Sequence, residues 1–168
     1  MGYVHDTHMS QYIPPTTMMG ITGTFTLAAG AVSGTIAYHR AAAAQTSVIY
    51  IPVTLPSNSS SNKGAYLKSI EVDYENLLAA ATSVTFGLSK VTRGANTAVA
   101  VVSAVTVTQD LAAAVAAATE DQHKCTVTLT TPEWIDNDVY YILTMTIVAG
   151  GTVTNDVLGA VANYTLRL

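Results

Sequence analysis

Apolar and polar residues alternate with a period of two from Ile21 to the end of the chain, and this pattern constrains the fold most. Successive side chains of a β-strand point to opposite faces, so the alternation predicts strands that bury one face. Ile70, Val72 and Tyr74, for example, alternate with polar neighbours. Strands are predicted over residues 35–39, 49–55, 69–74, 83–88, 98–108, 125–130, 141–148 and 162–168.

About eight short strands separated by turn residues predict an all-β domain, either an antiparallel two-sheet sandwich or a jelly roll. Pro52 places its strand at a sheet edge or a bulge, because proline lacks the N–H that a central strand donates. Residues 110–120 favour a short helix, with a strand as the alternative. The inward-facing residues are expected to be Ile70, Val72, Tyr74, Val84, Phe86, Val127, Leu129, Trp134, Tyr141, Leu143 and Met145.

The first twenty residues lack this alternation. They hold four of the five methionines and the pair Pro14-Pro15, which forces an extended backbone. We therefore expect an extended N-terminal arm over 1–20 and a β-sandwich domain over 21–168. The arm is expected to contact a neighbouring subunit and to be removable without unfolding the sandwich. Its candidate assembly residues are Tyr3, His5, His8, Met9, Tyr12, Ile13, Pro14 and Pro15.

The composition favours association over charge-driven binding. Only 11% of the 168 residues are charged and the net charge is −4, whereas about a quarter charged is ordinary for a soluble domain. Little electrostatic repulsion then opposes contact between copies. The seven Lys and Arg residues are scattered, which argues against nucleic-acid binding. No apolar run suits a membrane span and no signal peptide is recognisable, so neither a membrane partner nor secretion is expected.

Three features of the sequence are candidates for chemistry. His5 and His8 have a spacing that binds metal on a helix, but Pro14-Pro15 disfavours a helix there. The acidic turn from Glu133 to Asp138 either holds Ca²⁺ or is a solvated turn between strands, and the latter fits better. Cys125 alternates with apolar residues and is expected to be buried. No catalytic, cofactor-binding or metal-binding residues are predicted, and we expect no enzymatic activity.

Two stretches carry a resemblance to a known class of proteins. KGAYLKSIEVDYE (63–75) and TPEWIDNDVYYILTMTIVAGGTVTNDVLGAVANYTLRL (131–168) resemble small β-sandwich virion structural proteins of tailed bacteriophages, of the head-decoration and head-fibre type. The shared features are a glycine before an alternating strand, a P-x-W-hydrophobic-D corner and a terminal Y-T-L-R strand. The resemblance implies a virion location, synthesis in the host cytoplasm and a major capsid protein or other virion protein as partner.

These observations predict a non-enzymatic structural subunit. It would self-assemble as a homo-oligomer or decorate a viral capsid, with the N-terminal arm contacting neighbouring subunits. One alternative is a receptor- or carbohydrate-binding fibre module, which would need an exposed aromatic cleft. Another is a subunit of an extracellular tube or filament.

Overall fold

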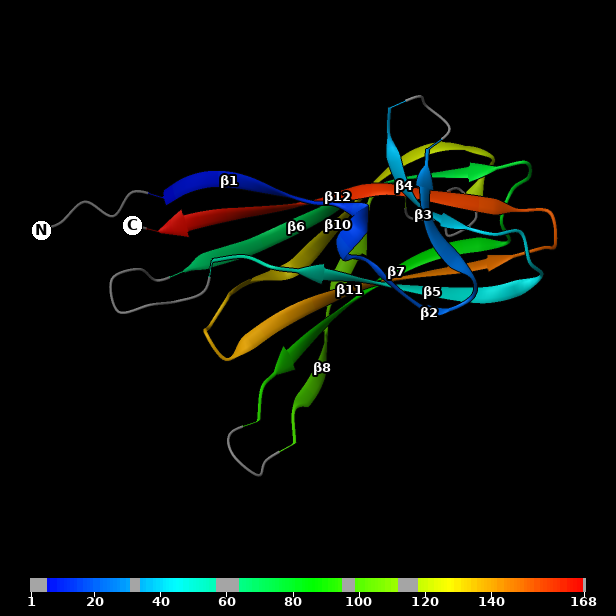
Figure 1. Ribbon diagram of the computed structural model, residues 1–168. Helices are drawn as coiled ribbons and strands as arrows, with labels where there is room; N and C mark the ends of the chain where they lie inside the picture. Colours follow the sequence, from blue (N-terminus) through cyan, green and yellow to red (C-terminus); the bar gives the residue numbers. More distant parts are fainter. Residues whose placement is uncertain (1–5, 31–33, 57–63, 95–98, 112–117, 168) are drawn as a thin grey trace, which may run out of the picture.

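The chain folds into a sandwich of two antiparallel sheets, which confirms the predicted fold class (Figure 1). The computed structural model describes residues 6–30, 34–56, 64–94, 99–111 and 118–167. Within these ranges, the larger sheet has seven strands in the order β3-β4-β12-β6-β10-β9, with β1 paired to β12. Its strands are β1 (Asp6–Ile13), β3 (Phe25–Ala29), β4 (Ile36–Arg40), β6 (Ala65–Leu77), β9 (Val107–Gln109), β10 (Asp121–Trp134) and β12 (Thr154–Arg167).

The smaller sheet has five strands in the order β2-β5-β11-β7-β8. A 3-10 turn, η1 (Pro15–Thr17), leads the chain from β1 in the larger sheet to β2 in the smaller one. Among the described residues no helix has the length and apolar character that a membrane span requires. The strands of the smaller sheet are β2 (Met19–Thr22), β5 (Gln45–Val53), β7 (Ser83–Thr92), β8 (Val101–Val105) and β11 (Val139–Ala149).

The core lies between the two sheets and follows the predicted alternation. Nine of the eleven expected core residues are buried; Phe86 and Trp134 are only half-buried. The pairing of β7 with β8 covers Leu88 to Thr92 only. Phe86 precedes this stretch, so β8 does not cover the edge of β7 beside it. Trp134 has the opposite parity to the buried residues Leu129 and Ile135, so it faces outward. The nine are Ile70, Val72, Tyr74, Val84, Val127, Leu129, Tyr141, Leu143 and Met145.

The N-terminal segment is extended but does not form a separate arm. Residues 6–13 are strand β1, which pairs with β12 of the same chain from Asp6–Arg167 to Ile13–Ala160. A domain boundary at 20/21 would fall inside β2. The sequence suggested an extended arm outside the sandwich because residues 1–20 lack alternation. The first half of β1 lacks it because both of its faces are exposed.

Two other local predictions concern Pro52 and the helix. Pro52 lies in β5 beyond Val48–Tyr50, the stretch that β2 covers, so this part of β5 has one open side in the described structure. The open side accommodates a residue without an N–H donor. Most of the helix expected over 110–120 falls on residues 112–117, outside the described residues.

Arg40 is one of several buried polar side chains that the sequence did not single out. Arg40 is fully buried, yet its guanidinium donates to Ser47 Oγ at 2.7 Å, the Val153 carbonyl at 2.8 Å and the Ala43 carbonyl at 2.7 Å. Burial lowers its pKa. A buried cation is tolerated only when its donors are satisfied, so Arg40 fixes the ends of β4, β5 and β12 relative to one another.

Candidate functional site

One side of the sandwich is built from the N-terminal segment. β4 and β1 share a single edge of β12: β4 pairs with Asn155–Val157, and β1 pairs with Ala160–Arg167. Leu158 and Gly159 lie between these two stretches. The 3-10 turn η1 and the edge strand β2 complete this side of the molecule (Figure 1).

A groove lies where β1 and β4 fail to meet. It consists of two adjoining hollows of about 350 and 510 Å³, which share Thr16, Gly34, Thr35 and Ile36. None of the described lining residues carries a charge, and most of them are apolar. The groove can therefore bind another apolar surface. The lining residues are Tyr12, Pro14, Pro15, Thr16, Leu27, Ala28, Ala29, Gly34, Thr35, Ile36 and Leu158.

Two contacts hold the side chain of Tyr12 in this groove. Its hydroxyl donates to the Leu158 carbonyl at 2.9 Å, and its ring lies on the backbone of Gly159. A Cβ added at Gly159 would lie 2.5 Å from the Tyr12 ring, and the backbone φ of Gly159 is +150°. Only glycine fits such a close approach in that conformation. The ring is thus held in place although 57% of Tyr12 is exposed.

Large apolar side chains are exposed on the strands around the groove. Ile36 and Tyr12 are each 57% exposed, in a chain whose core is otherwise well covered. Contiguous exposed apolar surface on a monomer marks an interaction site, whereas scattered single residues do not. The apolar side is defined here as the groove with the three large, exposed residues of its lining: Tyr12, Leu27 and Ile36.

The predicted assembly residues are divided between this surface and the interior. Met9 and Tyr12 are exposed, and Pro14 lines the groove. Ile13 and Pro15 are buried in their own chain, although Pro15 also contributes to the lining of the groove. His8 Nδ1 lies 3.4 Å from Thr165 Oγ1; Tyr3 and His5 lie outside the described residues.

Sequence reasoning missed Leu27 and Ile36. The alternation in 35–39 indicates that one set of residues faces inward, but not which set. The structure buries the small Ala37 and leaves Ile36 outside. No local signal distinguishes these two arrangements, because the choice depends on the strands that cover the sheet.

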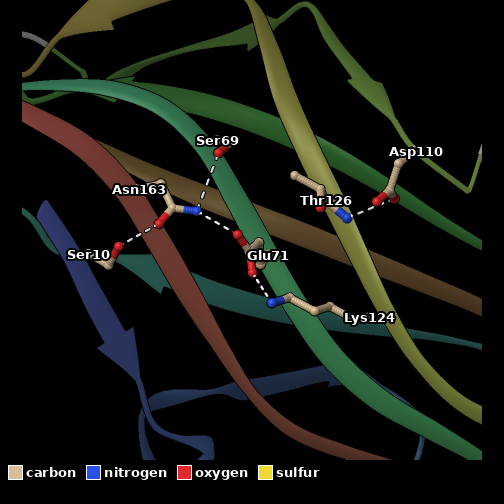
Figure 2. Close-up of polar contacts among 7 residues, drawn as sticks. All are labelled: Ser10, Ser69, Glu71, Asp110, Lys124, Thr126 and Asn163. Carbon is tan, nitrogen blue, oxygen red and sulfur yellow. Dashed lines mark hydrogen bonds and ion pairs between the residues drawn. The ribbon is translucent and has the colours of Figure 1, made fainter. Parts of the chain in front are cut away.

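A polar network on the outer face of the larger sheet ties β1 to its own domain (Figure 2). Ser10 Oγ donates to Asn163 Oδ1 at 2.6 Å, and Asn163 Nδ2 donates to Glu71 Oε1 at 2.9 Å. Lys124 pairs with the other oxygen of Glu71. The network crosses β1, β12, β6 and β10 in turn. It holds strands together and engages the side chains that could otherwise bind a ligand.

The carboxylates of this face differ in their protonation behaviour. The hydrogen bond from Lys124 lowers the pKa of Glu71, although partial burial acts in the opposite direction. Burial raises the pKa of Asp73, against the opposing charge of Lys124. On β10 the Thr126 N–H donates to Asp110 Oδ1 at 2.8 Å. Glu71 and Asp110 therefore have evident hydrogen-bond partners within the fold.

The acidic turn between β10 and β11 has its first carboxylate occupied. Glu133 Oε2 accepts from Lys90 Nζ at 3.0 Å and from the Tyr141 hydroxyl at 2.7 Å. Arg93 donates from its backbone to the Asp138 carbonyl at 2.8 Å. In the described ranges no group of three His, Cys, Asp or Glu side chains is placed to hold a metal ion.

Cys125 is buried, as the alternation predicts, and it has no disulfide partner. Burial raises the pKa of its thiol to about 12, with hydrogen bonding and charge as smaller influences. A thiol that stays protonated and enclosed is a poor nucleophile. Cys125 therefore acts as a small core residue.

A separate hollow of about 230 Å³ lies on the outer face of the larger sheet. Tyr66 and Trp134 form one wall, with ring centroids 4.7 Å apart and planes tilted by 40°. Asp6, Lys68 and Thr165 complete the lining. Aromatic faces beside hydrogen-bonding groups suit a hydroxylated ligand.

Comparisons with known proteins show only a distant likeness. No protein-family model matches the sequence, and no curated protein matches it. A solved structure of carbohydrate-binding modules from the beta-sandwich superfamily aligns with 95% of this chain and 56% of its own chain, at 8% identity and a TM-score of 0.46. An arabinose-bound α-L-arabinofuranosidase aligns with 88% of this chain and 23% of its own, at 7% identity and a TM-score of 0.45.

This chain therefore spans about half of the first of these structures and about a quarter of the second. At 7–8% identity both likenesses concern the fold alone.

Proposed function

We propose that this chain is a non-enzymatic structural subunit that assembles with copies of itself through the apolar side. The observation that carries the proposal is the uncharged groove between β1 and β4, surrounded by exposed large apolar residues. The occupant is the apolar side of a second copy. A contact of this surface with itself about a two-fold axis places uncharged groups against uncharged groups.

Charge supports the same choice of partner. The whole chain carries a net charge of −4 with only 11% charged residues. Two copies therefore meet with little repulsion, and apolar burial supplies the attraction. A strongly charged partner such as nucleic acid would gain nothing from this surface.

The setting that we propose is a virion. Its support is the resemblance of residues 63–75 and 131–168 to small β-sandwich proteins of tailed bacteriophages. In that setting the subunit decorates a capsid and contacts the major capsid protein or another virion protein. The alternative is a subunit of an extracellular tube or filament. Such a subunit would use the same apolar side but would assemble outside a virion.

The test introduces a charge into the groove. Ile36→Asp places a carboxylate at a 57%-exposed groove residue, and Leu78→Asp is the matched control at a 73%-exposed leucine outside the groove lining. Sedimentation velocity over a concentration series is expected to show assembly of the unmodified chain and of Leu78→Asp, but smaller species for Ile36→Asp. Circular dichroism checks that both variants remain folded.

Two results would overturn the proposal. One is an unmodified chain that stays monomeric up to the highest concentrations. The other is a folded Ile36→Asp variant that assembles as strongly as Leu78→Asp.

The hollow beside Tyr66 and Trp134 favours a second candidate function, the binding of a neutral saccharide as in a fibre module. Trp134 is the only tryptophan, so its fluorescence reports directly on this site. Titration with neutral oligosaccharides is expected to change the emission, and Tyr66→Ala is expected to weaken the change. A constant emission across the oligosaccharides would exclude this function.

A further inference from the structure

The strand β8 is the last strand of the smaller sheet, at the edge opposite β2. It pairs with β7 from Leu88–Val105 to Thr92–Val101, and no other described strand covers its outer side. Val101 and Val102 are 64% and 65% exposed. The outward N–H and C=O groups of such an edge can pair with another strand.

Both faces of β8 are open as well as its edge. Val101 and Ser103 point to one face and Val102 and Ala104 to the other, and all four are exposed. Figure 1 shows the β7–β8 hairpin extending away from the rest of the sandwich. A second strand can therefore approach the Val101–Ser103 part of β8 freely, whereas Ala104 and Val105 border a hollow that they share with Thr130, Thr131 and Glu133 of the larger sheet.

The sequence of this edge lacks most of the devices that keep edge strands apart. Residues 99–108, VAVVSAVTVT, contain no charge, no proline and no glycine. Natural monomers protect an edge with charged side chains, proline or bulges. β8 has five residues, which is an ordinary strand length, so shortness does not protect it either. An edge of this kind in a folded protein is expected to be covered.

We infer that β8 pairs antiparallel with β8 of a second copy. The inference rests on the proposed self-assembly but uses a surface different from the apolar side. An antiparallel pair centred on Ser103 places Val102 opposite Ala104 and Val101 opposite Val105. No like charges meet, because the segment has none, and the two five-stranded sheets become one continuous sheet.

The two surfaces lie on different sheets, because the groove of the apolar side is formed beside β1, β3 and β4 of the larger sheet and β8 is an edge strand of the smaller one. One copy can therefore engage one neighbour through the apolar side and another through β8. Repetition of both contacts makes an extended array, whereas either contact alone stops at a dimer. The size of the assembly thus reports on each surface separately.

Cysteine cross-linking tests the pairing directly. Opposed Cα atoms of an antiparallel pair lie about 4.5–5.5 Å apart, which suits a disulfide. Val102→Cys, Ser103→Cys and Ala104→Cys are made singly, with Leu78→Cys as an exposed control away from β8. In the pair centred on Ser103 only Ser103 lies opposite itself, so Ser103→Cys is expected to form covalent dimers under mild oxidation many times faster than Val102→Cys, Ala104→Cys or the control. The natural Cys125 is buried and does not interfere.

A second measurement separates this inference from the proposed function. Val102→Lys adds a charge to the edge, and Val102→Thr keeps a β-branched side chain there. Val102→Lys is expected to reduce the array to dimers held by the apolar side, and Ile36→Asp to dimers held by β8. If folded Ile36→Asp forms assemblies as large as those of Leu78→Asp, the proposed function is refuted and the β8 pairing is not. Equal assembly of Val102→Lys and Val102→Thr, or absence of β8 cross-links, would refute the β8 pairing.

Discussion

The hydroxyl of Tyr141 donates a hydrogen bond of 2.7 Å to Glu133 Oε2 and so joins the two sheets near the end of β10. Tyr141 belongs to β11 in the smaller sheet and Glu133 to β10 in the larger one. Lys90 of β7 donates to the same oxygen at 3.0 Å. A carboxylate on one sheet is thus held by two donors from the other.

This contact makes stability depend on pH. Burial by itself raises the pKa of Glu133, but the hydrogen bonds from Tyr141 and Lys90 outweigh it, and the pKa lies below its ordinary value. A lowered carboxyl pKa stabilises the fold above the unfolded-state pKa of about 4.3, and the effect is lost as the pH falls through the folded-state value. Glu133→Gln is expected to cost about 1 kcal/mol at pH 7, and the difference should shrink as the pH falls from the unfolded-state pKa through the lower folded-state pKa. Urea unfolding at several pH values measures it, and a difference that stayed constant with pH would contradict it.

Burial depth sets the cost of truncating core side chains. Leu143 is fully buried, so Leu143→Ala is expected to cost about 2–5 kcal/mol. Phe86 is half-buried and contacts the Tyr74 ring at a centroid distance of 5.9 Å. Phe86→Ala should therefore cost about 2 kcal/mol, below the 3–5 kcal/mol of a fully buried phenylalanine. Denaturant midpoints compare the two, and equal losses would show that Phe86 is more enclosed than the structure indicates.

The sequence predicted the core strands well because alternation is a local signal. Ile70, Val72, Val127 and Leu129 each lie two residues from a buried neighbour, and their strands need no distant information to be recognised. Trp134 was predicted to face the core, but it is the last residue of β10 and its side chain faces outward. Which face it takes depends on how far the alternation of β10 continues. The partner strand decides where that alternation ends.

The side of the sandwich that carries the candidate site could not be predicted. Ser10 and Asn163 are 153 positions apart in the sequence, yet they form a hydrogen bond that holds β1 on β12. Nothing in residues 6–13 indicates that partner. Because the groove exists only where β1 and β4 share an edge of β12, its position follows from long-range pairing.

The N-terminal segment is expected to be necessary for stability. Removal of residues 1–15 takes away the partner of β12 along Ala160–Arg167 and the buried side chain of Ile13. The loss should be at least about 2–3 kcal/mol from Ile13 burial alone. Thr7→Ala, an exposed change on the same strand, should stay within about 0.5 kcal/mol of the unmodified chain. A truncated chain with an unchanged melting temperature would show that the segment is a removable arm after all.

Cys125 should be unreactive in the folded protein. With its pKa raised to about 12 by burial, roughly one thiol in ten thousand is ionised at pH 8, compared with about a quarter for a free cysteine. Labelling with a chromogenic disulfide reagent is expected to be negligible in buffer and complete in guanidinium. Fast stoichiometric labelling in buffer would mean that the strands around Cys125 open readily.

The response of the assembly to salt distinguishes apolar packing from electrostatic attachment. The apolar side and β8 carry no charged groups among the residues that define them. Ion pairs between exposed groups are screened within about 8–10 Å at physiological salt, whereas apolar burial is not screened and sulfate strengthens it. The assembly is therefore expected to survive molar NaCl and to dissociate in guanidinium or detergent. Sedimentation across a NaCl series provides the measurement. Release at a few tenths molar NaCl would instead indicate that the net charge of −4 holds the subunit on a basic partner.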